Sequence, residues 1–299
     1  MISAAKKIYH NATERFPALG VLRVNRFYFG NIRPLWTNMR YLRYHRFCRR
    51  AYVPAETNGM VSRVQETARH FRENGYVLLH PPYDPHLIPG LAARCQELVN
   101  RGQFTTIAGV EEWFLNISNS LSNVPELTSL IHPEVEAVIE ACFGSHFKIY
   151  SSELYRTVPT HTPPEASALW HTDNYPPAVY KIMVYLTPCD KETGALRLHP
   201  LPSTRRILRQ GFFNRYKASP FQRQLDHDGV TVEGPAGTVL FWNSNMIHRA
   251  HAPSKAFRDV AAFKLLPSPE PWQKHLARAR EKINYENRTE QVPTDPVQD

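Results

Sequence analysis

Residues 230–266 read VTVEGPAGTVLFWNSNMIHRAHAPSKAFRDVAAFKLL and give the clearest indication of fold class in the chain. Short apolar runs alternate there with Gly, Pro, Asn and Ser, which end strands and form turns. We expect strands at 230–233, 238–243, 246–251 and 258–266. Short strands in such quick succession are typical of a β-sandwich or a β-barrel.

The residues before this stretch predict helices first and strands later. Apolar residues recur at helical spacing over 61–71, and Asn74-Gly75 is a typical helix end. Further helices are expected at 85–100, 133–143 and 272–284. Further strands are expected at 76–79, 147–157, 178–187 and 195–199. The segment 101–130 is expected to be loop with a short helix. The predicted fold class is therefore mainly β, with flanking helices packed outside a barrel or sandwich.

The chain of 299 residues is expected to form one main domain with additions at both ends. We assign a basic N-terminal extension to residues 1–58, the main domain to 59–268, and a C-terminal helix with a polar tail to 269–299. Within the main domain, the basic and aromatic segment 203–228 has a helical pattern and could cover a cavity as a lid.

Positive charge is concentrated at the N-terminus. Residues 1–50 contain eleven Lys and Arg against one acidic residue, a net charge of +10, while the whole chain carries +9. The arginines of residues 40–50 fall at helical spacing and could present one basic face to an acidic surface or partner. No sequence-specific contact with nucleic acid is expected, because a charge run specifies no partner. The alternative is a solvated face on a helix that is packed onto the domain by Tyr41, Tyr44 and Phe47.

The sequence also predicts a cellular compartment. No apolar run approaches the ~20 residues of a transmembrane helix, and the N-terminus lacks the apolar segment of a signal peptide. The four cysteines form no CxxC pair, which favours free thiols in a reducing compartment. We therefore expect a cytoplasmic protein.

Two potential metal ligands stand one residue apart in Trp170-His171-Thr172-Asp173, and a third, His248, follows the strand-like segment 237–242. A His-x-Asp pair alone is weak evidence, because chance gives about 0.4 such pairs for this composition. Residues i and i+2 of a strand share a face, so His171 and Asp173 can reach one ion, and His248 would join them from another strand. Two imidazoles and one carboxylate are the ligands of a mononuclear non-haem Fe(II) oxygenase, and they leave positions open for a cosubstrate and O₂.

Arg258 begins the expected strand 258–266, ten residues after His248. An arginine in an apolar barrel interior is costly unless it meets an anion. The distal carboxylate of a dicarboxylate cosubstrate would supply that anion, in the bidentate geometry that arginine favours. The alternative is a surface salt bridge with Asp259 or Glu233.

With these residues in place, the chain resembles the phytanoyl-CoA dioxygenase family of Fe(II)- and 2-oxoglutarate-dependent oxygenases over about Glu73 to Leu266. The resemblance rests on the order and spacing of Asn74-Gly75-Tyr76-Val77, His171-Thr172-Asp173, Tyr185 to Pro200, Gly234 to Phe241, His248 and Arg258. It implies a double-stranded β-helix, a barrel of the jelly-roll or cupin type. It also implies that His171, Asp173 and His248 bind Fe(II), and that Arg258 binds the distal carboxylate of 2-oxoglutarate.

The resemblance leaves two points open. Relatives also hold the cosubstrate with residues on the strand before the His-x-Asp turn, and that region contains here Tyr155, Arg156 and Thr157, of which Thr157 is our candidate. The family commonly has a Pro-Gly-Ser-His turn where this chain has Pro200 to Thr204, which leaves the substrate class undetermined. The retained Asp173 argues against the related halogenases, in which a small residue replaces the carboxylate.

The leading functional hypothesis is a hydroxylase that uses Fe(II), 2-oxoglutarate and O₂ on a small molecule, either a lipid or acyl derivative or a secondary metabolite. One alternative is a cupin-type metalloenzyme that does not use 2-oxoglutarate. Another is a non-catalytic barrel that acts as a binding or adaptor protein. Arg258 discriminates between the enzyme hypotheses, because the cupin alternative gains if that side chain points away from the metal.

Overall fold

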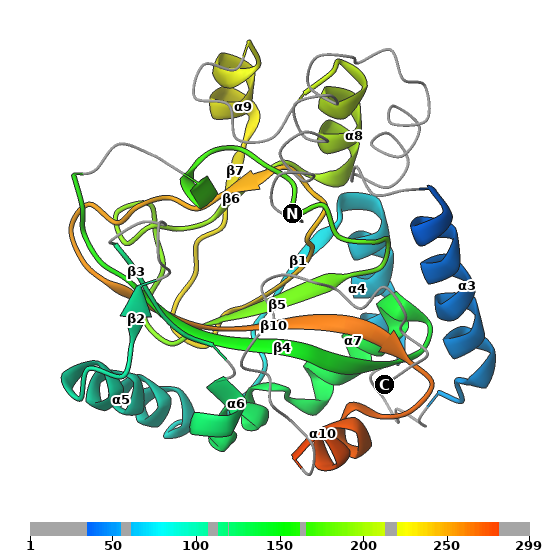
Figure 1. The fold of residues 1–299 in the computed structure, drawn as a ribbon, viewed down its shortest axis with the longest axis horizontal. Helices are drawn as coiled ribbons and strands as arrows, with labels where there is room; N and C mark the ends of the chain where they lie inside the picture. Colours follow the sequence, from blue (N-terminus) through cyan, green and yellow to red (C-terminus); the bar gives the residue numbers. More distant parts are fainter. Residues whose placement is uncertain are drawn as a thin grey trace, which may run out of the picture.

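A seven-stranded antiparallel sheet runs through the centre of the molecule in the order β1-β8-β5-β10-β4-β3-β2 (Figure 1). The structure, a computed structural model, describes residues 35–54, 61–106, 113–118, 120–161, 166–212 and 220–280. The strands of this large sheet are β1 Tyr76–Leu79, β2 Thr105–Thr106, β3 Phe114–Ser118, β4 His146–Thr157, β5 Tyr180–Tyr185, β8 Val239–Asn243 and β10 Arg258–Ser268.

A second, three-stranded sheet has the order β7-β6-β9 and consists of β6 Arg197–Leu198, β7 Val230–Thr231 and β9 His248–Arg249. Its buried Leu198 belongs to the same hydrophobic cluster as Tyr185 and Trp242 of the large sheet. Two antiparallel sheets joined by a common core confirm the predicted mainly β fold class.

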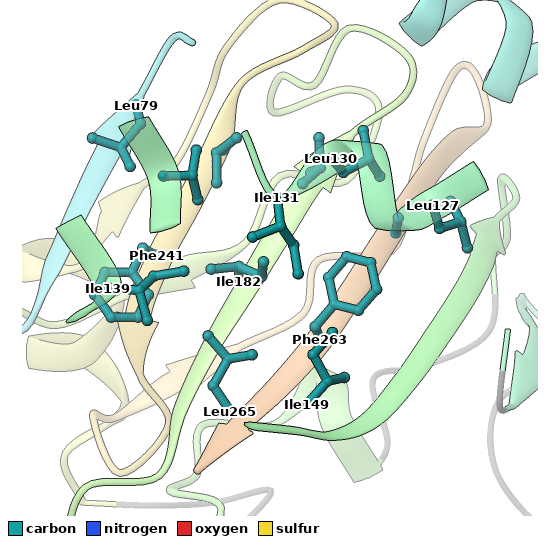
Figure 2. Packing of buried hydrophobic residues seen from close by; sticks show 14 of the residues in the cluster. Leu79, Leu127, Leu130, Ile131, Ile139, Ile149, Ile182, Phe241, Phe263 and Leu265 are labelled. Carbon is teal, nitrogen blue, oxygen red and sulfur yellow. The ribbon is translucent and has the colours of Figure 1, made fainter. Parts of the chain in front are cut away.

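Helices cover the outer face of the large sheet: α4 Val61–Asn74, α5 Leu87–Asn100, α7 Pro133–Phe143 and α10 Trp272–Arg280. Because strand side chains alternate, Phe263 and Leu265 of β10 point to this face together with Ile182 and Phe241 (Figure 2). Each such buried side chain contributes roughly 1.5–3 kcal/mol of hydrophobic stabilisation. The opposite side chains of the same strands are left to form the inner face.

Helix α3, Leu35–Ala51, is the part of the basic N-terminal extension that the structure describes. Tyr41 is buried against Val179 and Leu266, so this helix packs onto the domain. Phe47 is 57% exposed, so its expected packing is wrong. Residues 1–34 lie outside the described residues, and both the contact with an acidic partner and the proposed domain division stay predictions. Within the described ranges, no helix is long and apolar enough to cross a membrane.

The segment 101–130 differs from the prediction of loop with a short helix. It contains strands β2 and β3, followed by helix α6 Ser120–Asn123 and the 3₁₀-helix η1 Pro125–Leu130. Strand β3 pairs along β4 from Phe114↔Thr157 to Ser118↔Glu153. The five residues of β3 show no clear alternation of apolar and polar side chains. Pairing with the long neighbouring strand β4 therefore determines their conformation.

Candidate functional site

The two predicted histidine ligands are cross-strand partners. The segment at His171 runs antiparallel beside β9, where His171 and His248 exchange both backbone hydrogen bonds with N···O distances of 2.9 and 2.8 Å. Their ring centroids lie 4.2 Å apart. The pairing of strands therefore brings together two histidines that are distant in the sequence.

Hydrogen bonds to the backbone orient both imidazoles. Nδ1 of His171 lies 2.7 Å from the carbonyl oxygen of Leu169, and Nδ1 of His248 lies 2.9 Å from that of Met246. A carbonyl oxygen can only accept, so each Nδ1 carries the proton and each Nε2 keeps a lone pair for a metal. Burial and the neighbouring His171 lower the pKa of His248 to about 3, which keeps this ring in the neutral form that metals bind.

Asp173 completes the group with one of its two carboxylate oxygens. Its Oδ1 lies 3.6 Å from Nε2 of both His171 and His248, and its Oδ2 lies 2.5 Å from Nζ of Lys181. Burial opposes the ionisation of Asp173, but the positive charge of Lys181 outweighs it and holds the pKa of this carboxyl well below its usual value. Lys181 thus occupies one oxygen and leaves the other facing the imidazoles.

These three side chains fit a metal ion. One ligand atom from each lies within 4.8 Å of the others, and no other His, Cys, Asp or Glu group of this kind occurs in the described ranges. Two imidazole nitrogens and one carboxylate oxygen are the donor set of non-haem Fe(II) centres. The structure therefore assembles the residues that the sequence singled out, His171, Asp173 and His248.

A cavity of about 290 Å³ is lined by these three side chains and by Arg258. Arg258 is 2% exposed, with Nη1 3.6 Å from Sγ of Cys189 and its guanidinium 5.8 Å from the ring centroid of Tyr155. Among the described residues, its Nε has no hydrogen-bond partner and its guanidinium has no carboxylate partner. The surface salt bridge is therefore wrong as an interpretation, and Arg258 faces the cavity that contains the proposed metal ligands.

The three candidates on β4 lie in different places. Tyr155 lines the cavity, whereas Arg156 points to the outer face and donates to both oxygens of Asp259 at 2.7 Å. Thr157 is not among the cavity-lining residues, but it is fully buried and stands opposite Arg258 in the strand register. Its Oγ1 has no hydrogen-bond partner in the part of the chain that the structure describes. A contact between Thr157 and a cosubstrate stays a prediction.

Sequence reasoning missed two lysines that line the cavity, Lys181 of β5 and Lys264 of β10. Each is a single charged residue inside an apolar run, Lys181 within 178–187 and Lys264 within 260–266. A lysine is rarely buried unless it is paired, so a lone lysine in an apolar strand was a usable signal.

The segment 203–228 does not form the expected lid in its described part. It contributes to helices α8 Leu201–Arg209 and α9 Gln222–Asp228, which pack around Trp170 and Ile247. Nε1 of Trp170 donates to Oδ1 of Asp226 at 3.0 Å. None of the residues described in this segment lines the cavity, so the two helices support the neighbours of the histidines instead of covering the site.

Comparisons with known proteins address the fold and the family. The chain is similar to the α-ketoglutarate-dependent carbocyclase SnoK from nogalamycin biosynthesis, with 21% identity, a TM-score of 0.55, and coverage of 76% of this chain and 94% of SnoK. It is also similar to the epimerase SnoN in complex with Fe³⁺, α-ketoglutarate and nogalamycin RO, with 17% identity, a TM-score of 0.54, and coverage of 69% and 84%. A third similar structure is EctD from S. alaskensis with bound Fe, with 18% identity, a TM-score of 0.53, and coverage of 68% of this chain and 76% of EctD.

These likenesses confirm the double-stranded β-helix. No curated protein matches the chain significantly. The sequence profile of the family described as phytanoyl-CoA dioxygenase (PhyH) matches residues 71–260, well over half of the chain. The protein therefore belongs to the phytanoyl-CoA dioxygenase family of Fe(II)- and 2-oxoglutarate-dependent oxygenases.

Proposed function

We propose that this chain is a hydroxylase that uses Fe(II), 2-oxoglutarate and O₂ to oxidise a small-molecule substrate. His171, Asp173 and His248 would hold the iron, and Arg258 would hold the distal carboxylate of 2-oxoglutarate. One observation carries the proposal: a buried arginine with no carboxylate partner among the described residues lines the same cavity as the three ligand side chains.

When bound, Fe(II) and 2-oxoglutarate supply the oxidising chemistry that turns a C–H bond into C–OH with O₂. The chain contributes ligation, orientation and exclusion of water. The backbone carbonyls of Leu169 and Met246 fix the two imidazoles, and Lys181 fixes one oxygen of Asp173. Such outer contacts hold the ligands in the orientation that the metal requires.

Arg258 is suited to a carboxylate for two reasons. Its guanidinium can donate two parallel hydrogen bonds to the two oxygens of one carboxylate. Its burial removes it from solvent, so the attraction is weakly screened by salt. The hydroxyl of Thr157, which has no hydrogen-bond partner within the described ranges and stands opposite Arg258 in the register, is a candidate second donor to the same carboxylate.

A small molecule suits the site by size. The cavity volume of about 290 Å³ is just below the usual range for ligand pockets, roughly 300–1,000 Å³. A lipid or acyl derivative or a secondary metabolite is the expected class, and a relative of the same fold, SnoN, was solved with nogalamycin RO.

Anaerobic titration of the purified protein with Fe(II) and 2-oxoglutarate tests the proposal. A metal-to-ligand charge-transfer band should develop in the visible range as 2-oxoglutarate is added, and His171→Ala should abolish it. Admission of O₂ should then consume 2-oxoglutarate and form succinate, and a converted substrate should gain one oxygen atom. If no band develops in the wild-type protein, the proposal fails.

A further inference from the structure

Four neighbouring strands of the large sheet place one row of polar side chains along the cavity. The register pairs Ser151 of β4 with Lys264 of β10, Lys264 with Lys181 of β5, and Lys181 with Trp242 of β8. Residues directly opposite each other in an antiparallel sheet point to the same face, and all four side chains line the cavity. We name these four residues the donor row, because each side chain carries an O–H or N–H group.

Two members of the donor row have no internal acceptor. Oγ of Ser151 and Nε1 of Trp242 are buried and make no hydrogen bond within the described ranges. The indole N–H can only donate, and a buried donor without a partner destabilises the folded protein. Their position on the wall of a cavity indicates that a bound ligand supplies the acceptors.

The two lysines stand directly opposite each other, an arrangement of like charges that is unfavourable by itself. Lys181 is paired with Asp173 at 2.5 Å, but this carboxylate would share its charge with the proposed iron. Lys264 has a longer contact of 3.5 Å with Glu153, whose side chain is 32% exposed. The donor row is therefore only partly neutralised from within the chain.

The charges along the cavity leave a surplus of one positive charge. The cationic lining residues are Lys181, Lys264 and Arg258, and the acidic ones are Asp173 and Glu153. The charge of Fe(II) and that of the 2-oxoglutarate dianion cancel, so loading the site preserves the surplus. One further negative charge would complete the balance.

From this row we propose that the substrate is a small organic acid whose carboxylate binds to Lys264, Ser151 and Trp242. The inference rests on the proposed function, because it places the acid beside the proposed iron site. Lys264 lies six positions after Arg258 on β10, or ~20 Å along the strand, so substrate and cosubstrate have separate anion receptors. Lys181 belongs to the donor row and also contacts Asp173, so an acid bound to the row would hold a carbon near its own carboxylate beside the proposed iron.

Calorimetric titration of the protein, loaded with Fe(II) and 2-oxoglutarate without O₂, tests this inference. The probes are two acids with their neutral amides: benzoate with benzamide, and hexanoate with hexanamide. At least one acid should bind about tenfold more tightly than its amide, because a hydrogen bond to a charged acceptor is stronger than one to a neutral acceptor. Lys264→Met should remove this preference, and Lys264→Arg should retain most of it.

Matched variants separate this effect from general damage. Lys255→Met is the control, because its ammonium is exposed and pairs with Glu192 away from the cavity. Trp242→Phe and Ser151→Ala should each weaken the preference for acids, and they decide the outcome if Lys264→Met does not fold. The charge-transfer band with 2-oxoglutarate reports in every variant that the iron site is intact.

The outcomes distinguish this inference from the proposed function. A wild-type protein without the band overturns the proposed function. A protein that shows the band but binds no acid more tightly than its amide overturns the organic-acid inference alone. Retention of the full preference by Lys264→Met overturns it as well.

Discussion

Two arginines on neighbouring strands, Arg156 of β4 and Arg258 of β10, are similarly buried and differ in their partners. Their exposed fractions are 5% and 2%. Arg156 donates to both oxygens of Asp259 at 2.7 Å and to Gln96 at 2.8 Å. Arg258 has Sγ of Cys189 at 3.6 Å and no carboxylate partner among the described residues. A buried cation that is paired with a carboxylate of the chain has a structural role, whereas a buried cation without a counter-ion indicates a binding site for an anion.

The strand register explains why the two arginines differ. Arg258 stands opposite Thr157, and Asp259 stands opposite Arg156. Successive residues of a strand point to opposite faces, so Asp259 reaches Arg156 on the outer face while Arg258 turns to the cavity. One step along the strand thus separates a structural ion pair from a candidate anion receptor.

Arg156→Met should cause the largest loss of stability. It leaves Asp259 buried without its partner, and breaking a buried ion pair in this way costs about 3–5 kcal/mol. Urea denaturation of the ligand-free protein measures the loss. Arg94→Met, which breaks a pair with Glu97 on the surface, is the control and should leave stability unchanged. Equal behaviour of the two variants would contradict the structural role of Arg156.

Lys181→Met should have an intermediate effect, because Lys181 is a buried cation whose partner is itself a proposed iron ligand. Loss of its contact with Oδ2 of Asp173 should weaken Fe(II) binding about 10–100-fold, as is typical for groups that orient metal ligands. Lys264→Met is the matched control on the next strand, since Lys264 pairs with Glu153 instead. Titration of both variants with Fe(II) in the absence of O₂ measures their affinities for the metal. Equal Fe(II) affinities would show that Lys181 does not position Asp173.

Arg258→Met should have little effect on stability in the absence of ligands. Removing a buried charge that has no counter-ion among the residues described by the structure should leave the free energy of unfolding unchanged or raise it by about 1 kcal/mol. Urea denaturation of Arg258→Met and Arg156→Met under the same conditions compares their free energies of unfolding. A loss as large as that of Arg156→Met would reveal an internal role for Arg258 and remove the contrast between the two residues.

The smallest change in stability is expected from a change in pH, because it alters the protonation of a buried neutral histidine and leaves both arginines charged. Burial lowers the pKa of His199, whose Nε2 lies 3.1 Å from the carbonyl oxygen of Leu225. As pH falls below the ordinary histidine value of about 6.5, the unfolded chain takes up a proton that the folded chain does not, so stability should decrease. Stability should be independent of this group at higher pH. Melting temperatures of the wild type and of His199→Asn, compared across that range, check the assignment, and an equal slope in both would exclude His199 as a cause.

Much of the fold and of the candidate site could be predicted because local sequence patterns specify it. Turn residues between apolar runs indicate the strands, and His171, Asp173, His248 and Arg258 stand out as polar residues at the ends of such runs. Strand β3 could not be predicted in this way, because it is stabilised by pairing with β4 and not by its own pattern.

The partners of charged residues could not be predicted, because they depend on register. Asp259 is adjacent to Arg258 in the sequence, yet it pairs with Arg156 across the ladder. The apolar runs around Lys181 and Lys264 show that both lysines are unusual, but only the pairing of strands shows that they stand side by side along one cavity.

Side-by-side titration of Fe(II)-loaded wild type, Arg258→Met and Arg156→Met with 2-oxoglutarate, without O₂ and followed at the charge-transfer band, tests the central claim most directly. Arg258→Met should weaken 2-oxoglutarate binding about 100-fold, the expected effect of removing one partner of a buried charge pair. Arg156→Met should bind 2-oxoglutarate with an affinity close to that of the wild type, despite its lower stability. Equal affinities of Arg258→Met and wild type would contradict the assignment of Arg258 as the receptor of the distal carboxylate.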